Sequence, residues 1–336
     1  MSGGVDSTAC ALLLREKYTV QGFFMHLAQP DFPAQKKRVE EIATRLGIPL
    51  HIIDLRPQFE TYVLQYFSKS YFDGLTPNPC VICNRKIKFG LFLDAITGSN
   101  MDYMATGHYA RLSENTGVFH LHKGTDPKKD QSYFLSRLTQ SQLAKVLFPL
   151  GGMTKENTYR YVEEQGFHNF QGLESQDVCF LNKNGIGHFL ESRSSMETES
   201  GPIRATDGSI LGTHNGLFNY TIGQRKGLGI SSEAPLYVIK LDTTNNAVIV
   251  GGNDELFCEE IRVKELHWLA GTPPDLSKNY SVRIRYSHKG SDAAIHMAGK
   301  DTAEITFQTP QRAITPGQFA VIYKETELLG SGIIEK

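Results

Sequence analysis

The chain has little of several features that would assign it to a specialised class of protein. Only five of its 336 residues are cysteine, and an odd, sparse set does not form the disulfide framework of a small secreted domain. Its apolar runs fall short of the roughly 18 residues that a membrane-spanning helix needs, and no secretory signal is visible. We therefore expect a cytoplasmic, reducing location and no membrane partner.

The chain also lacks an excess of charge of either sign. Its 35 basic and 36 acidic residues give a net charge of −1, whereas nucleic-acid-binding domains often carry a clear basic excess. Any contact with RNA must therefore use local basic patches. Four short segments are candidates, although such segments more often form a solvated surface: residues 85–88, 128–129, 225–226 and 283–289.

Length and hydrophobic periodicity predict three domains, because 336 residues exceed one ordinary core. In residues 1–195, helical periods such as that over 39–46 alternate with strand-like runs such as 50–55. This alternation predicts an α/β fold with a doubly wound parallel sheet. Short alternating strands follow, and they predict a β-rich domain over residues 196–253 and an antiparallel β-barrel over residues 254–336.

Alternation within the predicted barrel assigns side chains to its two faces. Around residue 284, the apolar side chains of Val282, Ile284 and Tyr286 share one face of a strand. Arg283 and Arg285 fall on the other face. Short strands with this alternation are typical of a small antiparallel barrel.

The most informative segment consists of Ser2, Gly3, Gly4, Val5, Asp6 and Ser7, directly before a helix-forming run. Adjacent glycines permit backbone conformations that a Cβ would block, so successive N–H groups can form an anion-binding nest. The N-terminus of the following helix adds partial positive charge. A Walker A loop is excluded because no lysine is present. The pattern predicts a phosphate site; the alternative is a glycine-rich turn capped by serine.

A Cys-x-x-Cys pair, Cys80 and Cys83, is the second informative feature. Asn84 is a candidate N-cap, which would place Cys83 just before a helix N-terminus. Three cations follow: Arg85, Lys86 and Lys88. Both the helix N-terminus and the cations would lower the pKa of Cys83 and favour the nucleophilic thiolate.

Two other readings of the cysteines stay open. A structural zinc site could use the Cys-x-x-Cys pair, although such sites usually have four Cys or His ligands and only Cys179 is an obvious third. Cys179 itself lies in a short apolar run, where a single cysteine is usually a small buried side chain.

Taken in order, seven segments resemble one family. They are SGGVDST (2–8), TPNPCVICNRKIKF (76–89), ATGHYAR (105–111), KDQSYFL (129–135), SQDVCF (175–180), TIGQRKGLG (221–229) and TPGQFAVIY (315–323). The chain resembles the tRNA-uridine 2-thiolases, or tRNA-specific 2-thiouridylases, which are PP-loop ATP pyrophosphatases. The resemblance covers nearly the whole chain and implies a PP-loop nucleotide-binding fold for the first domain.

The resemblance also implies roles for individual residues. Cys83 would be the nucleophile, and Cys179 would carry the persulfide sulfur. ATP, with magnesium, would be bound by Ser2, Gly3, Gly4, Val5, Asp6, Ser7, Met25 and Gly107. The target base would meet Asn78, Pro79 and Cys80. Further tRNA contacts would come from His108, Lys129, Asp130, Gln131, Arg285, Tyr286 and Gln318, and His108 could equally serve as a general acid or base.

The implied reaction is ATP-dependent 2-thiolation of the wobble uridine in the anticodon arm of tRNA. ATP adenylates the C2 oxygen, sulfur arrives as a persulfide on Cys179, and Cys83 forms a disulfide with Cys179. The sulfur would come from a donor such as a cysteine desulfurase or a sulfur-relay protein. The alternatives are another PP-loop adenylating ligase, which would need neither cysteine motif nor barrel, and an inactive RNA-binding relic.

Two features depart from the family pattern. Many members have aspartate at the position of Cys80, so an iron–sulfur cluster on Cys80, Cys83 and Cys179 is an alternative to the persulfide route. Members also carry a hydrophobic strand and a glycine before the segment that starts at Met1. We expect the central strand that supports the phosphate loop to be absent, and the chain to fold poorly or bind ATP weakly.

Overall fold

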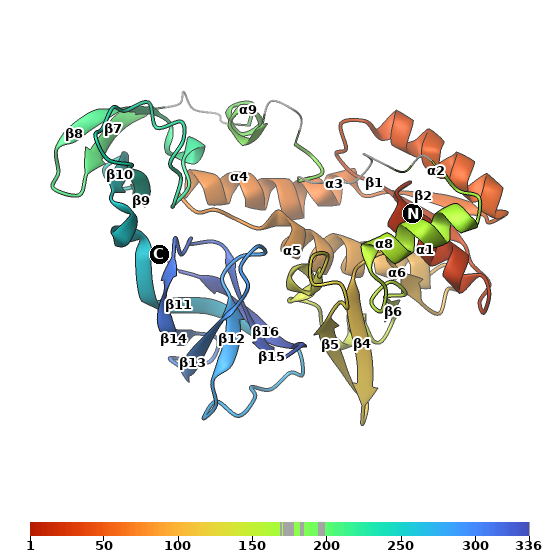
Figure 1. The fold of residues 1–336 in the computed structure, drawn as a ribbon. Helices are drawn as coiled ribbons and strands as arrows, with labels where there is room; N and C mark the ends of the chain where they lie inside the picture. Colours follow the sequence, from red (N-terminus) through yellow and green to blue (C-terminus); the bar gives the residue numbers. More distant parts are fainter. Residues whose placement is uncertain (169, 171–177, 182–184, 194–198, 336) are drawn as a thin grey trace.

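The computed structural model describes residues 1–168, 170, 178–181, 185–193 and 199–335 (Figure 1). The predicted first-domain boundary at residue 195 and the first half of the SQDVCF segment lie outside these residues. The elements follow the predicted order, with helices and parallel strands first, a β-rich region next and a barrel last. None of the described helices has the length and apolar character to span a membrane.

The N-terminal region has the predicted α/β character. β1 (Gly22–His26) pairs in parallel with β2 (Leu50–Asp54), and β3 (Met104–Ala105) pairs in parallel with β6 (Val146–Leu147). These pairs form two separate two-stranded sheets. The surrounding helices are α1 (Val5–Leu14), α2 (Phe32–Leu46), α3 (Arg56–Phe59), α4 (Gln65–Phe72), α5 (Pro79–Cys83), α6 (Phe92–Thr97), α7 (Gln140–Leu143), α8 (Lys155–Glu164) and α9 (Gly185–Glu191).

Helix α2 forms where the apolar period predicts it. Its buried side chains are Val39, Ile42, Ala43 and Leu46, which recur at helical spacing. It ends at Gly47, whose φ of 67° is the left-handed conformation that favours glycine at a helix C-terminus.

Two π-helical segments interrupt the helices nearest the cysteines. η1 (Glu60–Leu64) joins α3 to α4, and η2 (Asn84–Leu91) joins α5 to α6. Gly90 has a non-helical φ of −102° and ψ of −107°, so the second helix bends there. π-Helical turns are rare and occur mainly at functional sites, which draws attention to the turn that follows Cys83.

The middle region forms a four-stranded sheet. Its strands are β7 (Ser200–Ala205), β8 (Ile210–Asn215), β9 (Tyr237–Asp242) and β10 (Ala247–Gly251), in the order β8-β7-β10-β9. Its small core includes Ile203, Val238 and Val250. The predicted β-rich character of this region is confirmed.

The predicted antiparallel barrel is also confirmed. Its strands are β11 (Phe257–Trp268), β12 (Tyr280–Arg283), β13 (Ser291–Met297), β14 (Ala303–Arg312), β15 (Phe319–Lys324) and β16 (Glu327–Ile334), and pairing of β11 with β16 closes it. A hairpin of the first region, β4 (Ala110–Asn115) and β5 (Val118–Lys123), extends the sheet where Leu121 pairs with Leu328. Sequence analysis did not predict this hairpin.

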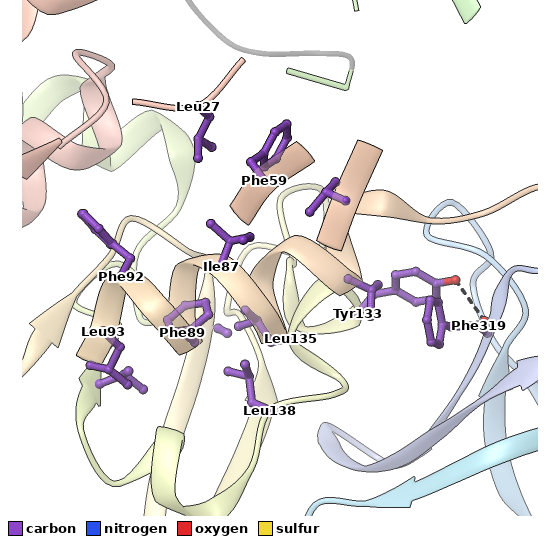
Figure 2. Close-up of a cluster of buried hydrophobic side chains, with 14 of the residues drawn as sticks. Leu27, Phe59, Ile87, Phe89, Phe92, Leu93, Tyr133, Leu135, Leu138 and Phe319 are labelled. Carbon is purple, nitrogen blue, oxygen red and sulfur yellow. Dashed lines mark hydrogen bonds between the residues drawn. The ribbon is translucent and has the colours of Figure 1, made fainter. Parts of the chain in front are cut away.

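The barrel and the first region share one hydrophobic core. Figure 2 shows Phe59, Ile87 and Phe89 of the helices in the cluster that continues to Tyr133 and Phe319. The Tyr133 hydroxyl donates a 2.9 Å hydrogen bond to the carbonyl oxygen of Phe319. The barrel is therefore packed firmly against the helices that carry Cys80 and Cys83.

Candidate active site

The predicted phosphate loop leads into α1 with an open helix N-terminus. Gly3 has a φ of 78°, and Gly4 is the N-cap without a side-chain hydrogen bond among the described residues. The hydroxyls of Ser7 and Thr8 donate to the Gly4 carbonyl oxygen over 3.0 and 3.1 Å. These contacts fix the loop, while the helix N-terminus stays available for an anion.

Gly107 lies directly against this loop. A Cβ at position 107 would come within 2.7 Å of the Asp6 Cβ, so only glycine fits without a shift. The turn after β3 therefore contacts the start of α1. Met25, the other predicted ATP contact outside the loop, lies in β1 and is half-buried, with its carbonyl oxygen bonded to the Gln29 side chain.

Asp6 is held by a network that sequence analysis missed. Its carboxylate accepts hydrogen bonds from Lys155 Nζ at 2.9 Å to each oxygen and from the Tyr109 hydroxyl at 2.8 Å. The Tyr109 hydroxyl lies 3.0 Å from Thr158 Oγ1. The network ties α1 to α8 beside the phosphate loop. A single lysine at the start of a helix carries no sequence signal for such a role.

The three cysteines of the two motifs converge. Cys80 and Cys179 both raise the pKa of Cys83, and Cys80 also raises the pKa of Cys179. Phe180, the residue after Cys179, is buried in the hydrophobic cluster against which Cys83 packs, so the two motifs meet at one place. Cys83 also packs against the shared core, and Cys179 is exposed. The structure thus brings together the two residues that the family resemblance makes catalytic.

The capping prediction for the cysteine helix is wrong. Asn78 is the N-cap, and its side-chain oxygen accepts from Val81 N at 3.3 Å. Asn84 instead lies inside the helix and donates to the Phe134 carbonyl oxygen at 3.0 Å. Pro79 occupies the first helical position, which proline favours. Cys80, and not Cys83, therefore lies in the first turn.

The prediction that the Cys83 thiol has a lowered pKa is also wrong. Burial raises the pKa of the Cys83 thiol to about 12, and Lys88 opposes this shift. Desolvation of the thiol by the surrounding protein, followed by the influence of Cys80, raises the pKa of Cys179 to about 11, although part of the residue is exposed to solvent. Burial also raises the pKa of Cys80. Desolvation outweighs the nearby cation because the charged thiolate loses water that one ammonium does not replace.

His108 is buried between aromatic rings. Its Nδ1 lies 2.8 Å from Thr106 Oγ1, and its ring centroid lies 5.5 Å from that of Phe89. Burial, with a smaller contribution from Lys88, lowers the pKa of His108 well below its ordinary value. The imidazole is therefore neutral at physiological pH, and its surroundings favour a positioned neutral ring over an exposed cationic RNA contact.

Asp130 and Arg283 form a buried ion pair between the first region and the barrel. Arg283 Nη1 lies 2.8 Å from Asp130 Oδ2, and the two side chains are 11% and 6% exposed. The other Asp130 oxygen accepts from Gly124 N at 3.2 Å and Ser132 N at 3.0 Å. Arg283 thus lies on the strand face opposite Val282 and Ile284, as the alternation predicts, and is buried against the first region. Asp130, expected to contact tRNA, has its carboxylate enclosed by the protein.

Several other residues expected to contact RNA already have partners within the chain. The Gln131 side chain accepts from Tyr109 N at 3.1 Å. Gln318 Nε2 donates to the Thr76 carbonyl oxygen at 2.9 Å, which ties the barrel to the loop before Asn78. Arg285, Tyr286 and Lys129 are half-buried near this junction. Arg285 Nη1 donates to the Arg312 carbonyl oxygen at 3.2 Å. Burial raises the pKa of Tyr286, and Lys129 opposes part of that rise.

The described residues contain no group of three histidine, cysteine or carboxylate side chains placed to hold a metal ion. The Asp6 carboxylate beside the phosphate loop is chemically suited to magnesium, although it is paired with Lys155 here.

Comparison with known proteins identifies the family. Residues 1–183 match the model of the tRNA methyl transferase HUP domain, residues 187–252 its PRC-barrel domain, and residues 258–334 the aminomethyltransferase beta-barrel domain. The chain is 54% identical over 334 residues to the tRNA-specific 2-thiouridylase of Desulfotalea psychrophila, covering 99% of this chain and 97% of that protein. The chain belongs to the tRNA-specific 2-thiouridylase family.

Other members of the tRNA-specific 2-thiouridylase family align over similar lengths. The protein of Syntrophotalea carbinolica is 41% identical over 341 residues, with 99% of this chain and 97% of that protein covered. The protein of Acetivibrio thermocellus is 38% identical over 351 residues, with 100% and 98% covered. The predicted family is confirmed.

Proposed function

We propose that this chain is an ATP-dependent tRNA-uridine 2-sulfurtransferase that thiolates the wobble uridine. One observation carries the proposal: Cys83 and Phe180, the residue after Cys179, come from segments far apart in sequence and pack in one hydrophobic cluster. A PP-loop ligase without sulfur chemistry would have no use for two thiols at this place. The exposed position of Cys179 suits a residue that receives sulfur from a donor protein, such as a cysteine desulfurase or a sulfur-relay protein.

The phosphate loop would serve the activation step. The nest at residues 2–7 and the N-terminus of α1 would hold the phosphates of ATP by backbone N–H groups. Magnesium, when bound, would neutralise phosphate charge, and Asp6 is the carboxylate that could hold it. Gly107 allows the turn after β3 to approach this place closely. The C2 oxygen of uridine would attack the α-phosphate, and pyrophosphate would leave from the nest.

The thiols would serve the sulfur-transfer step. The persulfide anion on Cys179 would attack C2 of the adenylated uridine, and AMP would leave with the electron pair of the broken C–O bond. The Cys83 thiolate would then attack Sγ of Cys179. The Cys83–Cys179 bond would form as the bond to the transferred sulfur breaks, and that sulfur would keep the electron pair as 2-thiouridine. An external thiol would reduce the disulfide for the next cycle.

Cys80 discriminates between the two sulfur routes. The persulfide route does not use its thiol, whereas a cluster on three cysteines needs it. We propose the persulfide route because Cys179 is exposed, where a sulfur-donor protein could reach it. Cys80→Asp should therefore keep thiolation activity. After anaerobic incubation with iron and sulfide, it should bind at least as much iron as the wild type. Loss of both activity and an iron-dependent visible absorption in Cys80→Asp would favour the cluster instead.

The experiment that tests the function is a single-turnover reaction with purified protein, ATP, a sulfur donor and unmodified tRNA. We expect 2-thiouridine in the digested tRNA together with AMP and pyrophosphate. Pyrophosphate release with no 2-thiouridine would instead support an adenylating ligase. Binding of tRNA with neither product would support an inactive RNA-binding protein.

A further inference from the structure

The turn that follows Cys83 has an unusual register. Cys83 is the N-cap of η2, so the first turn of the π-helix runs from Cys83 toward Lys88. A π-helix is defined by i→i+5 hydrogen bonds, which place residues five apart on the same face. An α-helix would turn Lys88 well away from Cys83. The π-helix therefore places Lys88 one turn after Cys83, on the same side of the helix.

The protein fixes that register from both sides. Asn84 donates to the Phe134 carbonyl oxygen at 3.0 Å, and Gln142 Nε2 donates to the Arg85 carbonyl oxygen at 3.0 Å. Ile87 and Phe89 are fully buried in the core, as Figure 2 shows. These contacts leave the turn little freedom to rotate, so the placement of Lys88 is built into the fold.

Lys88 differs from the two cations before it. Lys86 is exposed, and the charge of Arg85 acts on Arg137 and His267. Lys88 is half-buried and lowers the pKa of Cys80, Cys83 and Cys179. For Cys80 and Cys83 it is the only group among the described residues that does so.

The charged and titratable groups that face one another here come from four parts of the fold. Around Lys88 they are the Met1 amino group, Cys80, Cys83, His108 and Cys179. Around Cys83 they are Lys88, Cys80 and Cys179, with no carboxylate among the described groups that shift it. Among the groups named here, Lys88 is the one that acts on each of the others.

We propose that Lys88 is the charge partner of the sulfur-transfer thiols, stabilising the thiolate of Cys83 and the persulfide anion on Cys179. The persulfide part rests on the proposed function; the thiolate part does not. In this role Lys88 does not react itself. It stabilises the negative charge on the sulfur atoms that react. The buried site makes each thiolate costly, and this ammonium offsets part of that cost.

The test measures thiolate reactivity without tRNA. Full-length wild type and variants are alkylated with iodoacetamide between pH 7 and 10, and mass spectrometry gives the rate at each cysteine. In Lys88→Met we expect the rate at Cys83 at pH 8 to fall about tenfold, as a one-unit rise in thiol pKa would cause. Lys88→Arg should restore it. The exposed Cys258 supplies an internal reference that should not change.

Lys86→Met is the matched control, because it removes an exposed ammonium from the same helix. An unchanged Cys83-to-Cys258 rate ratio in Lys88→Met, or an equal fall in Lys86→Met, would overturn the proposal. Should Lys88→Met unfold at the assay temperature, Lys88→Gln carries the same comparison. A tenfold fall in the Cys83 alkylation rate of Lys88→Met, with no thiolation by the wild type, would support the role of Lys88 and refute the proposed function. Thiolation by the wild type, with an unchanged Cys83 alkylation rate in Lys88→Met, would support the proposed function and refute the role of Lys88.

Discussion

Replacing Asp130 by asparagine separates a structural role from a tRNA contact. Asparagine keeps an oxygen for Gly124 N and Ser132 N, but it removes the negative charge opposite Arg283. Both side chains are almost fully buried, at 6% and 11% exposure, so solvent screening does not weaken the pair. Breaking a buried ion pair by removing one partner typically costs about 3–5 kcal/mol.

The lower end of this range applies to Asp130→Asn. Arg283 keeps a hydrogen bond to the Tyr286 carbonyl oxygen, and its guanidinium lies 5.7 Å from the Tyr133 ring centroid and 5.8 Å from that of Tyr323. These rings retain some stabilisation of the abandoned charge. We therefore expect the free energy of unfolding to fall by about 3 kcal/mol.

Urea unfolding followed by Trp268 fluorescence measures this change, because the only tryptophan of the chain lies in barrel strand β11. In a double-mutant cycle, Asp130→Asn with Arg283→Met should cost about 1–3 kcal/mol less than the sum of the single changes. A loss below about 0.5 kcal/mol with additive effects, together with weaker tRNA binding, would refute the structural role and restore the predicted tRNA contact.

Three further predictions concern the site. Cys83→Ser and Cys179→Ser should each abolish 2-thiouridine formation while ATP-dependent pyrophosphate release survives, and normal thiolation by either would remove it from the reaction. Asp6→Ala should lower ATP turnover by about tenfold or more with tRNA affinity unchanged in filter binding; weaker tRNA binding with intact turnover would contradict the assignment. The pKa of His108 is lower in the folded state than in the unfolded state, so the unfolded state takes up a proton first as the pH falls. The contribution of the neutral imidazole to stability is therefore present above about pH 6.5 and is lost as the pH falls below that value. Between pH 7 and 5 the wild type should lose about 2 kcal/mol more than His108→Gln, and parallel pH profiles in urea titrations would exclude this.

Sequence patterns predict those helices and strands whose formation depends on residues that are near one another in the sequence. The apolar period at Val39, Ile42 and Leu46 reflects burial of one helix face, so sequence and structure agree on α2. The hairpin β4–β5 has no such pattern, because its strands are mostly exposed or half-buried and gain a partner only when β16 is beside them. Its pairing depends on long-range contacts that no local period encodes.

The same distinction between local and long-range determinants applies to the candidate site. The motifs predict that residues near Cys83 and Cys179 act together, and the structure packs Cys83 and Phe180, the residue after Cys179, in one hydrophobic cluster. The sequence could not distinguish Asn78 from Asn84 as the N-cap, since both precede helical residues. It also could not assign Arg283 to a buried pair, because alternation gives the face of a strand but not what packs against that face. The expected instability of the chain stays a prediction.

The most direct measurement is nucleoside mass spectrometry of unmodified tRNA after incubation with this protein, ATP, magnesium and a persulfide-forming sulfur donor. We expect 2-thiouridine at the wobble position, formed with about one AMP per thiolated base, and none with Cys83→Ser or Cys179→Ser. Wild-type protein that cleaves ATP in the presence of tRNA but leaves every uridine unthiolated would contradict the proposed function.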